Sequence, residues 1–245
     1  MVRQLDTQES VPAQSLATRL REGTQKSHSA AEGTDFIRCF LRGVVDKASY
    51  RLLVANLYFV YSALEEEITR HRHHPVLGQL FFEELWRQKS LELDLLYYFG
   101  SDWRHCVQPS LACQKYLQRI RDLSAESPEL LVAHAYTRYM GDLSGGQILK
   151  KIAREAMALT DGGTSFYEFE AIRNQGEFKK QYRQAIDGLP VNEDLAIKIV
   201  DEANFAFHLN MEMFRELQGN WFLGLSKVAL NSVISALRSP RKVRY

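Results

Sequence analysis

Long segments of the chain repeat apolar residues at helical spacing, and almost none alternate apolar and polar residues as a strand does. The segment 47–73 is a clear case, because Leu57, Tyr61 and Leu64 recur every three or four residues and Pro75 stops the pattern. The same spacing predicts further helices over residues 15–32, 83–98, 110–124, 127–159, 176–187 and 192–217, the last of them bending at Gly219 and continuing to Leu237. We therefore expect an all-α fold of seven or eight helices.

The length of 245 residues fits a single domain, and no repeat or linker divides it. We predict one helical domain over residues 15–237, preceded by a flexible N-terminus (1–14) and followed by a basic tail (238–245). The net charge is only +1, so no global field attracts nucleic acid. Three cysteines without a CxxC pair predict reduced thiols in a cytosol-like compartment and no zinc site.

Two features bear on membranes. The N-terminus lacks the apolar segment of a secretory signal, and no uncharged apolar run reaches the length of about 18 residues that a membrane span needs. The closest approach is "GNWFLGLSKVALNSVISAL", which Lys227 interrupts. The apolar residues of this segment pack either on a protein core or partner or on a lipid surface. We favour packing on a protein core or partner. We expect no transmembrane anchor.

Carboxylate-rich helical bundles can hold two iron ions, but that site needs paired Glu-x-x-His motifs. No histidine of this chain has glutamate three residues before it, so the di-iron hypothesis fails. His28 is a better candidate, because Glu32 lies one helical turn later and can hold the second ring nitrogen of an iron-ligating imidazole. Taken alone, such a pair is more often a surface interaction.

The segment 133–153, "AHAYTRYMGDLSGGQILKKIA", is helical in pattern yet contains Gly141, Gly145 and Gly146. Each glycine costs a helix about 1 kcal/mol relative to alanine. Bare backbone one turn apart lets a flat ligand approach closely, and Asp142 beside it can organise water near a bound oxygen species. Tight packing between helices is the alternative for a lone GxxxG pattern.

Five strings together resemble the heme oxygenase family: "REGTQKSHSAAE", "NLYFVYSALEEEI", "ELLVAHAYTRYMGDLSGGQILKKIA", "FKKQYRQAI" and "VDEANFAFHLNMEMFREL". The third string is similar to the signature of that family almost residue for residue. The similarity runs in one register from about Leu16 to Leu217. It implies a fold in which heme lies between a proximal and a distal helix.

The resemblance assigns a role to each matching position. His28 matches the proximal iron ligand and Glu32 its support, while Asp142 matches the carboxylate that orders distal water. The other matches are the distal-helix glycines (Gly141, Gly145, Gly146), the partners of the water network (Tyr61, Tyr116, Arg138), the residues at the heme propionates (Arg21, Tyr136, Lys179, Arg183) and the pocket lining (Phe207, Asn210, Phe214).

Two positions depart from the family pattern. Gln25 stands where some relatives carry a basic residue near the propionates, although Lys26 is adjacent. Arg21 replaces lysine, which keeps the charge but changes the contact geometry. Both positions affect the grip on the propionates and leave the iron site unchanged.

The implied activity is oxidative cleavage of heme b, both substrate and cofactor, with O2 at the α-meso carbon to give biliverdin IXα, carbon monoxide and Fe2+. Because the chain has no flavin, nicotinamide or iron–sulfur motif, electrons must come from outside. Similarity to soluble microbial and plastid forms implies reduced ferredoxin as donor, a bilin reductase downstream for phycobilin or phytochrome chromophores, and a location in bacterial cytoplasm or plastid stroma. The rival hypotheses are a protein that binds heme without degrading it and a helical hydrolase with a pocket cysteine.

Overall fold

The structure, a computed structural model, describes residues 14–238, with side chains described through residue 217. Helices make up its secondary structure, and residues 14–238 contain no strand. The α-helices are α1 (Leu16–Gly23), α2 (Gln25–Glu32), α3 (Asp35–Leu41), α4 (Lys47–Arg70), α5 (Gln88–Phe99), α6 (Trp103–Cys106), α7 (Leu111–Glu126), α8 (Leu131–Ala135), α9 (Gly141–Ala156), α10 (Gln175–Asp187) and α11 (Glu193–Arg238). The tighter or wider turns are η1 (Leu77–Leu80), η2 (Glu83–Leu85), η3 (Pro128–Leu130), η4 (Tyr136–Met140) and η5 (Ser165–Tyr167).

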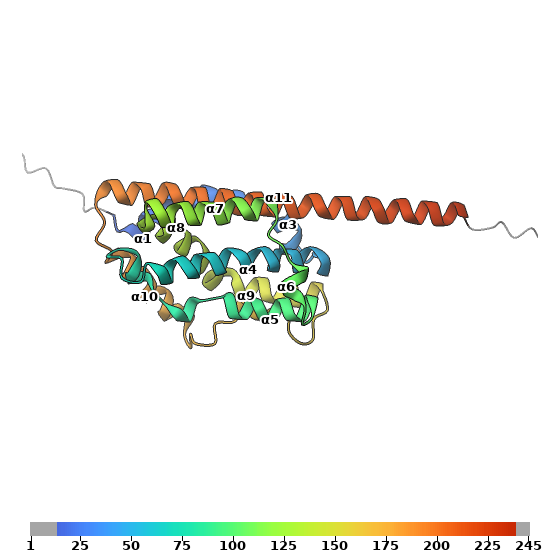
Figure 1. The fold of residues 1–245 in the computed structure, drawn as a ribbon, viewed down its shortest axis with the longest axis horizontal. Helices are drawn as coiled ribbons and strands as arrows, with labels where there is room; N and C mark the ends of the chain where they lie inside the picture. Colours follow the sequence, from blue (N-terminus) through green and yellow to red (C-terminus); the bar gives the residue numbers. More distant parts are fainter. Residues whose placement is uncertain (1–13, 239–245) are drawn as a thin grey trace, which may run out of the picture.

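Helix α4 lies at the centre of the molecule. Figure 1 shows it between a row formed by α7 and α11 and a row formed by α5 and α9, with these axes roughly aligned. Its side chains are buried on more than one face: Val60, Tyr61 and Leu64 are completely buried. A helix that is apolar around much of its circumference belongs in a protein core. The all-α fold expected from the sequence is therefore confirmed.

The predicted first helix, 15–32, is in fact two helices that meet at Thr24. The hydroxyl of Thr24 donates to the carbonyl of Leu20 at 2.7 Å, a local bond that competes with helix continuation. Gly23 also permits a close approach to α11, because a Cβ there would lie 2.6 Å from Cγ1 of Val200. The break separates α2, which carries His28, from α1.

The periodicity of apolar residues did not predict two short helices, because each spans too few residues to show a repeat. The structure adds α3, in which Phe36 and Phe40 are buried one turn apart, and the four-residue α6. The helix predicted over 83–98 begins only at Gln88, after a separate 3-10 turn. The predictions over 47–73, 110–124 and 176–187 match α4, α7 and α10 within three residues at each end.

The helix predicted over 127–159 is divided into four parts: η3, α8, the π-helical turn η4 and α9. The π turn occupies Tyr136–Met140, directly before Gly141. Such a turn holds one extra residue, so it rotates everything after it by about 100° relative to an uninterrupted α-helix. By contrast, α11 runs without interruption through Gly219, where a bend was expected.

Some predictions concern parts of the chain outside the description. The predicted flexible N-terminus and basic tail lie largely within residues 1–13 and 239–245, which the structure does not describe. The prediction that the segment 219–237 packs on a protein core or partner concerns side chains that are also outside the description. Within the described range, no helix combines the length and the apolar character that crossing a bilayer requires. Cys39, Cys106 and Cys113 are all free thiols, as expected.

A buried carboxylate joins α4 to the start of α5. Glu65 accepts the backbone N–H of Arg87 at 2.5 Å and that of Gln88 at 3.2 Å, so it satisfies donors that a helix start leaves open. Burial raises the pKa of Glu65 to about 7, against a partial opposing effect of these hydrogen bonds. The folded chain therefore holds a proton on Glu65 at pH values where the unfolded chain has lost it.

The raised pKa of Glu65 predicts how the free energy of unfolding depends on pH. The contribution of Glu65 is fully present below about pH 4.5 and is lost as the pH rises through 7, a change of roughly 3 kcal/mol in the free energy of unfolding. We expect the stability difference between wild type and Glu65→Gln to fall by that amount from pH 4 to 8. Chemical denaturation across this range measures it, and parallel pH curves for the two proteins would contradict the prediction.

Candidate active site

A carboxylate, a hydroxyl and a guanidinium meet where α4 passes the start of α9. Tyr61 donates its hydroxyl hydrogen to Asp142, and Nε of Arg138 donates to the Tyr61 oxygen at 3.2 Å. The guanidinium of Arg138 also lies over the Tyr61 ring, 5.3 Å from its centroid. A second guanidinium nitrogen donates to Oδ1 of Asn210 on α11. Three elements distant in sequence therefore hold this polar cluster.

Burial and nearby cations act against each other on Asp142. Burial raises its pKa, while Arg138, the Tyr61 hydroxyl and the more remote Arg87 lower it, and the net direction is upward. A carboxyl with a raised pKa can exchange a proton near neutral pH more readily than an exposed aspartate. The expected association of Asp142, Tyr61 and Arg138 is present in the structure.

The glycines of α9 divide into two kinds. A Cβ added at Gly141 or Gly145 would meet nothing within 4 Å, so this face of the helix borders open space. A Cβ at Gly146 would lie 3.4 Å from the ring of Tyr167 and faces the protein. Among the residues that the structure describes, no neighbouring helix packs on the first two glycines, so the packing explanation of the GxxxG pattern does not apply to them there.

The other candidate wall is α2. Nδ1 of His28 lies 3.7 Å from a carboxylate oxygen of Glu32, and both side chains are more than half exposed. The imidazole ring meets the ring of Phe207 edge to face, with 5.8 Å between centroids. One ring nitrogen therefore has a carboxylate neighbour, and the imidazole remains accessible to a ligand.

Helix α11 connects the two walls. Phe207 contacts His28, and Asn210, three residues later, binds Arg138. Phe214, one further turn along, stacks on Phe36 of α3 with 6.1 Å between centroids. This face of α11 thus places an apolar ring, an amide and a second ring along one line; their role as a pocket lining stays a prediction.

A group of basic residues lies near Tyr136. The hydroxyl of Tyr136 is half-buried, which raises its pKa, and the nearby charges of Arg183 and Arg21 act in the opposite direction. Arg21 comes from α1 and Arg183 from α10, which also carries the half-buried Lys179. In the folded chain, Tyr136 is therefore close enough to Arg21 and Arg183 to interact with their charges. All three were predicted to lie at the heme propionates.

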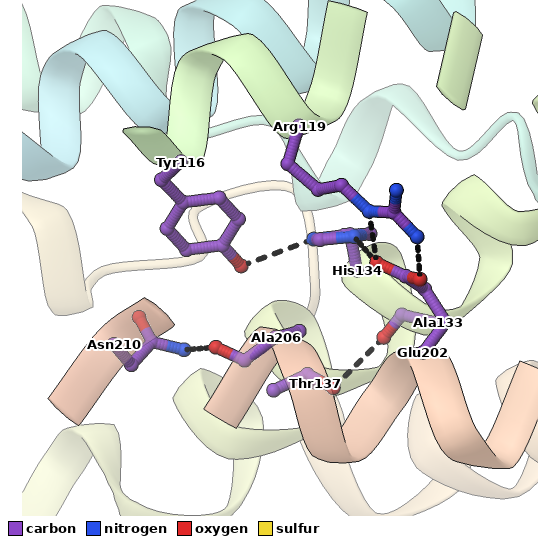
Figure 2. A network of polar contacts seen from close by, with 8 residues as sticks. All are labelled: Tyr116, Arg119, Ala133, His134, Thr137, Glu202, Ala206 and Asn210. Carbon is purple, nitrogen blue, oxygen red and sulfur yellow. Dashed lines mark hydrogen bonds and ion pairs between the residues drawn. The ribbon is translucent and has the colours of Figure 1, made fainter. Parts of the chain in front are cut away.

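The sequence reasoning missed several polar residues behind the site. Tyr116 is completely buried, its hydroxyl pairs with Nδ1 of His134 at 3.3 Å, and Nε2 of His134 pairs with Glu202 at 2.9 Å (Figure 2). His134 lies inside the glycine-helix motif, and its only signal was a polar residue within the apolar run "LLVAHA". Glu202 gave no distinguishing signal.

These features define a class of protein: an all-α domain in which bare helix backbone borders open space, together with a partly buried carboxylate, an accessible imidazole and nearby cations. The donor set fits a heme, since a neutral imidazole is an iron ligand and bidentate cations suit propionates. The open Cβ positions of Gly141 and Gly145 leave room for it.

Comparison with known proteins agrees with this description. A family model described as heme oxygenase matches residues 14–216. The chain is 57% identical over 218 residues to "Heme oxygenase 1" of the cyanobacterium Synechocystis, covering 89% of this chain and 91% of that protein. It is 52% identical to "Heme oxygenase" of Porphyra purpurea, covering 91% and 94%.

A solved structure of Synechocystis heme oxygenase-1 in complex with heme superimposes with a TM-score of 0.86 at 57% identity and covers 90% of this chain and all of that one. Heme oxygenase from Leptospira interrogans gives a TM-score of 0.80 at 47% identity, covering 83% of this chain and all of that one. The chain therefore belongs to the heme oxygenase family.

The open space beside Gly141 and Gly145 predicts how substitution of the α9 glycines changes the stability of the protein. Gly141→Ala and Gly145→Ala remove a helix-weakening glycine without a clash, so each should raise the stability of the ligand-free protein by up to about 1 kcal/mol. Gly146→Ala, the matched control, should gain less because its methyl group must fit against Tyr167. Thermal unfolding measures the three variants, and a loss of stability at Gly141 would show that the space is filled.

Proposed function

We propose that this chain is a heme oxygenase that cleaves heme b with O2 at the α-meso carbon and releases biliverdin IXα, carbon monoxide and Fe2+. One observation supports this most directly: the partly buried carboxylate of Asp142 is held by the Tyr61 hydroxyl on the same turn of α9 where Gly141 and Gly145 leave open space. When bound, heme supplies the iron that activates O2 and the porphyrin carbon that is oxidised.

His28 is the proposed axial ligand of the heme iron. Its accessible imidazole would hold the iron through one nitrogen, with Glu32 beside the other nitrogen and Phe207 against the ring. A neutral imidazole donates less electron density to iron than a thiolate does. This favours oxidation of the porphyrin over cleavage of the oxygen–oxygen bond.

Asp142 is proposed to order water on the other side of the heme and to pass on a proton. Tyr61 and Arg138 fix its carboxylate, so a water molecule that binds to it takes one position. Gly141 and Gly145 allow the heme to approach the helix backbone, and a side chain there would alter that approach. Gly146 contributes from behind, since its missing side chain lets Tyr167 support the helix.

The basic residues are proposed to set the orientation of the heme in its plane. Arg21, Lys179 and Arg183 offer charged donors to the two propionates, and the Tyr136 hydroxyl lies beside two of them. Fixing the propionates decides which meso carbon faces Asp142. Phe207, Asn210 and Phe214 are proposed to line the remaining edge, and Tyr116 is proposed to belong to the water network, with its hydroxyl paired to His134 behind the site.

The external electrons are proposed to come from reduced ferredoxin, because the sequence carries no redox cofactor motif of its own. The relatives in Synechocystis and Porphyra purpurea support this choice of setting. There the product would pass to a bilin reductase for phycobilin or phytochrome chromophores, in bacterial cytoplasm or plastid stroma.

Aerobic turnover tests the proposal and separates it from a protein that only holds heme. The protein is incubated with heme, ferredoxin, ferredoxin reductase and NADPH, and the products are separated by chromatography. We expect the Soret band to decay as biliverdin IXα and carbon monoxide appear. A stable Soret band with ferredoxin, and equally with a chemical reductant, would support the heme-holding alternative instead.

The role of Asp142 predicts a selective defect. Asp142→Asn should bind heme with little change but form biliverdin about 100-fold more slowly or worse, because the proton-carrying carboxylate is gone. Asp201→Asn makes the same chemical change at an exposed position of α11 and should behave as wild type. Wild-type rates of biliverdin formation in Asp142→Asn would remove this residue from the mechanism.

The role of His28 has an internal control in this chain. His208 and Glu212 form a second helical His–Glu pair of the same spacing, with 3.1 Å between Nε2 and a carboxylate oxygen. His28→Ala should lose the absorption and electron paramagnetic resonance spectra of an imidazole-ligated heme, and added imidazole should restore them. His208→Ala should keep them. An unchanged spectrum in His28→Ala would place the iron on another ligand.

A further inference from the structure

One face of α11 meets α2 and the end of α1 in three successive places. Val200, Asn204 and Phe207 are spaced by four and three residues, so they lie on the same side of α11. Val200 lies against Gly23, where a Cβ would come within 2.6 Å of its Cγ1. Phe207 meets the His28 ring. Between these two contacts, Asn204 binds the segment in which α1 ends and α2 begins.

The side-chain amide of Asn204 is held in a single orientation. Its Nδ2 donates to the carbonyl of Gly23 at 3.1 Å and to the carbonyl of Val200 at 3.0 Å. Its Oδ1 accepts the hydroxyl hydrogen of Ser27 at 2.5 Å. The reverse placement would turn the amide oxygen toward two carbonyl oxygens, which have no hydrogen to donate. Both hydrogens of the amide nitrogen and its oxygen are therefore in use.

Helix α2 has few other means of attachment. It is eight residues long, and a helix of that length is not stable in water by itself. Ala31 is its single buried residue, so α2 gains little from apolar burial. Its N-cap residue, Thr24, makes no side-chain hydrogen bond to the first turn, and the Thr24 hydroxyl donates to Leu20 instead. The contacts with α11 therefore decide how firmly α2 is held.

Asn204 binds the chain on both sides of the break between α1 and α2. The carbonyl of Gly23 lies at the end of α1, where the last carbonyls of a helix have no N–H partner within it. The Ser27 hydroxyl comes from the first turn of α2, and Ser27 directly precedes His28. One amide on α11 thus connects to the helix before the break and to the helix after it.

We propose that Asn204 is a positioning residue that acts on His28 through the docking of α2 on α11. By holding the chain on both sides of the break, Asn204 keeps the His28 imidazole beside Phe207. This inference rests on the proposed function, in which His28 is the axial ligand. It predicts that Asn204 controls how long a bound heme is retained, because local opening of α2 would carry the imidazole away.

Hydrogen–deuterium exchange of the heme-free protein tests the docking of α2. Ser27→Ala removes the hydroxyl that donates to Asn204, and Ser29→Ala is its matched control. We expect the backbone amides of residues 25–32 to exchange about fivefold faster in Ser27→Ala than in Ser29→Ala, the effect of one lost hydrogen bond. Mass spectrometry of peptides measures the rates. The amides of α4 serve as a reference and should exchange equally in both variants.

Ser29 is a close match for Ser27. It lies two residues later in α2, is exposed, and its hydroxyl has no hydrogen bond to the residues that the structure describes. Both variants replace serine by alanine in one helix, so both change the helix propensity in a similar way. Equal exchange of residues 25–32 in the two variants would overturn the proposal, and so would an equal acceleration in α4, which would indicate a general loss of stability.

Asn204→Leu tests the amide itself. Leucine has nearly the shape of asparagine without its donors or acceptor, so this change breaks the connections to Ser27 and to Gly23 together. It should accelerate exchange in α2 more than Ser27→Ala does. Adding Ser27→Ala to Asn204→Leu should change little further, since both changes break the same contact. A full additional acceleration in the double variant would show that Ser27 does not act through Asn204.

Heme dissociation tests the connection to His28. Each heme complex is mixed with excess apomyoglobin, which captures released heme, and the Soret absorption gives the rate. Ser27→Ala should release heme about fivefold faster than Ser29→Ala, and Asn204→Leu should also shift the iron–histidine stretching band in resonance Raman spectra. Unchanged dissociation despite faster exchange in α2 would overturn the positioning role. Failure of the proposed function has a different sign, namely an imidazole spectrum that survives in His28→Ala.

Discussion

The partly buried carboxylate of Asp142 imposes the main constraint on this structure. A carboxylate that loses part of its hydration must regain hydrogen bonds and opposite charge, and here Tyr61 supplies the hydrogen bond and Arg138 the charge. Tyr61 comes from the central helix α4, and Arg138 is anchored to Asn210 of α11. The site therefore depends on the relative placement of the helices that also form the core, so packing and chemistry are held by the same contacts.

The two sides of α9 differ for a physical reason. One side is open at Gly141 and Gly145, and the other is closed by the turn η5. Asp94 accepts the backbone N–H groups of Ser165 and Phe166, at 2.7 and 2.8 Å, and so fixes η5 to α5. η5 also supports α9 through Tyr167. The Tyr167 ring lies against the Gly146 position, and the Tyr167 carbonyl accepts a hydrogen bond from Gln147 at 2.8 Å.

The proposed iron ligand lies in a much looser environment than the carboxylate. His28 and Glu32 are both more than half exposed, and Phe207 provides the ring contact. A ligand bound against α2 and α9 would add contacts that the unliganded protein lacks, and binding would stabilise the folded state accordingly. In the proposed function the two groups have different tasks: the cluster around Asp142 would position a proton, and the accessible imidazole of His28 would bind a large flat ligand.

The sequence by itself determined the helical class, most helix ranges and the residues from which the site is built, because helical periodicity and the glycine-rich motif are local properties of the chain. It did not determine the break at Thr24, beside which Gly23 lies against Val200 of α11, or the π turn at 136–140, from which Arg138 binds Tyr61 and Asn210. Nor did it reveal that Gly146 differs from Gly145, or that His134 connects Tyr116 to Glu202. Those facts depend on which distant residues lie beside each position, and only the tertiary structure brings those residues together.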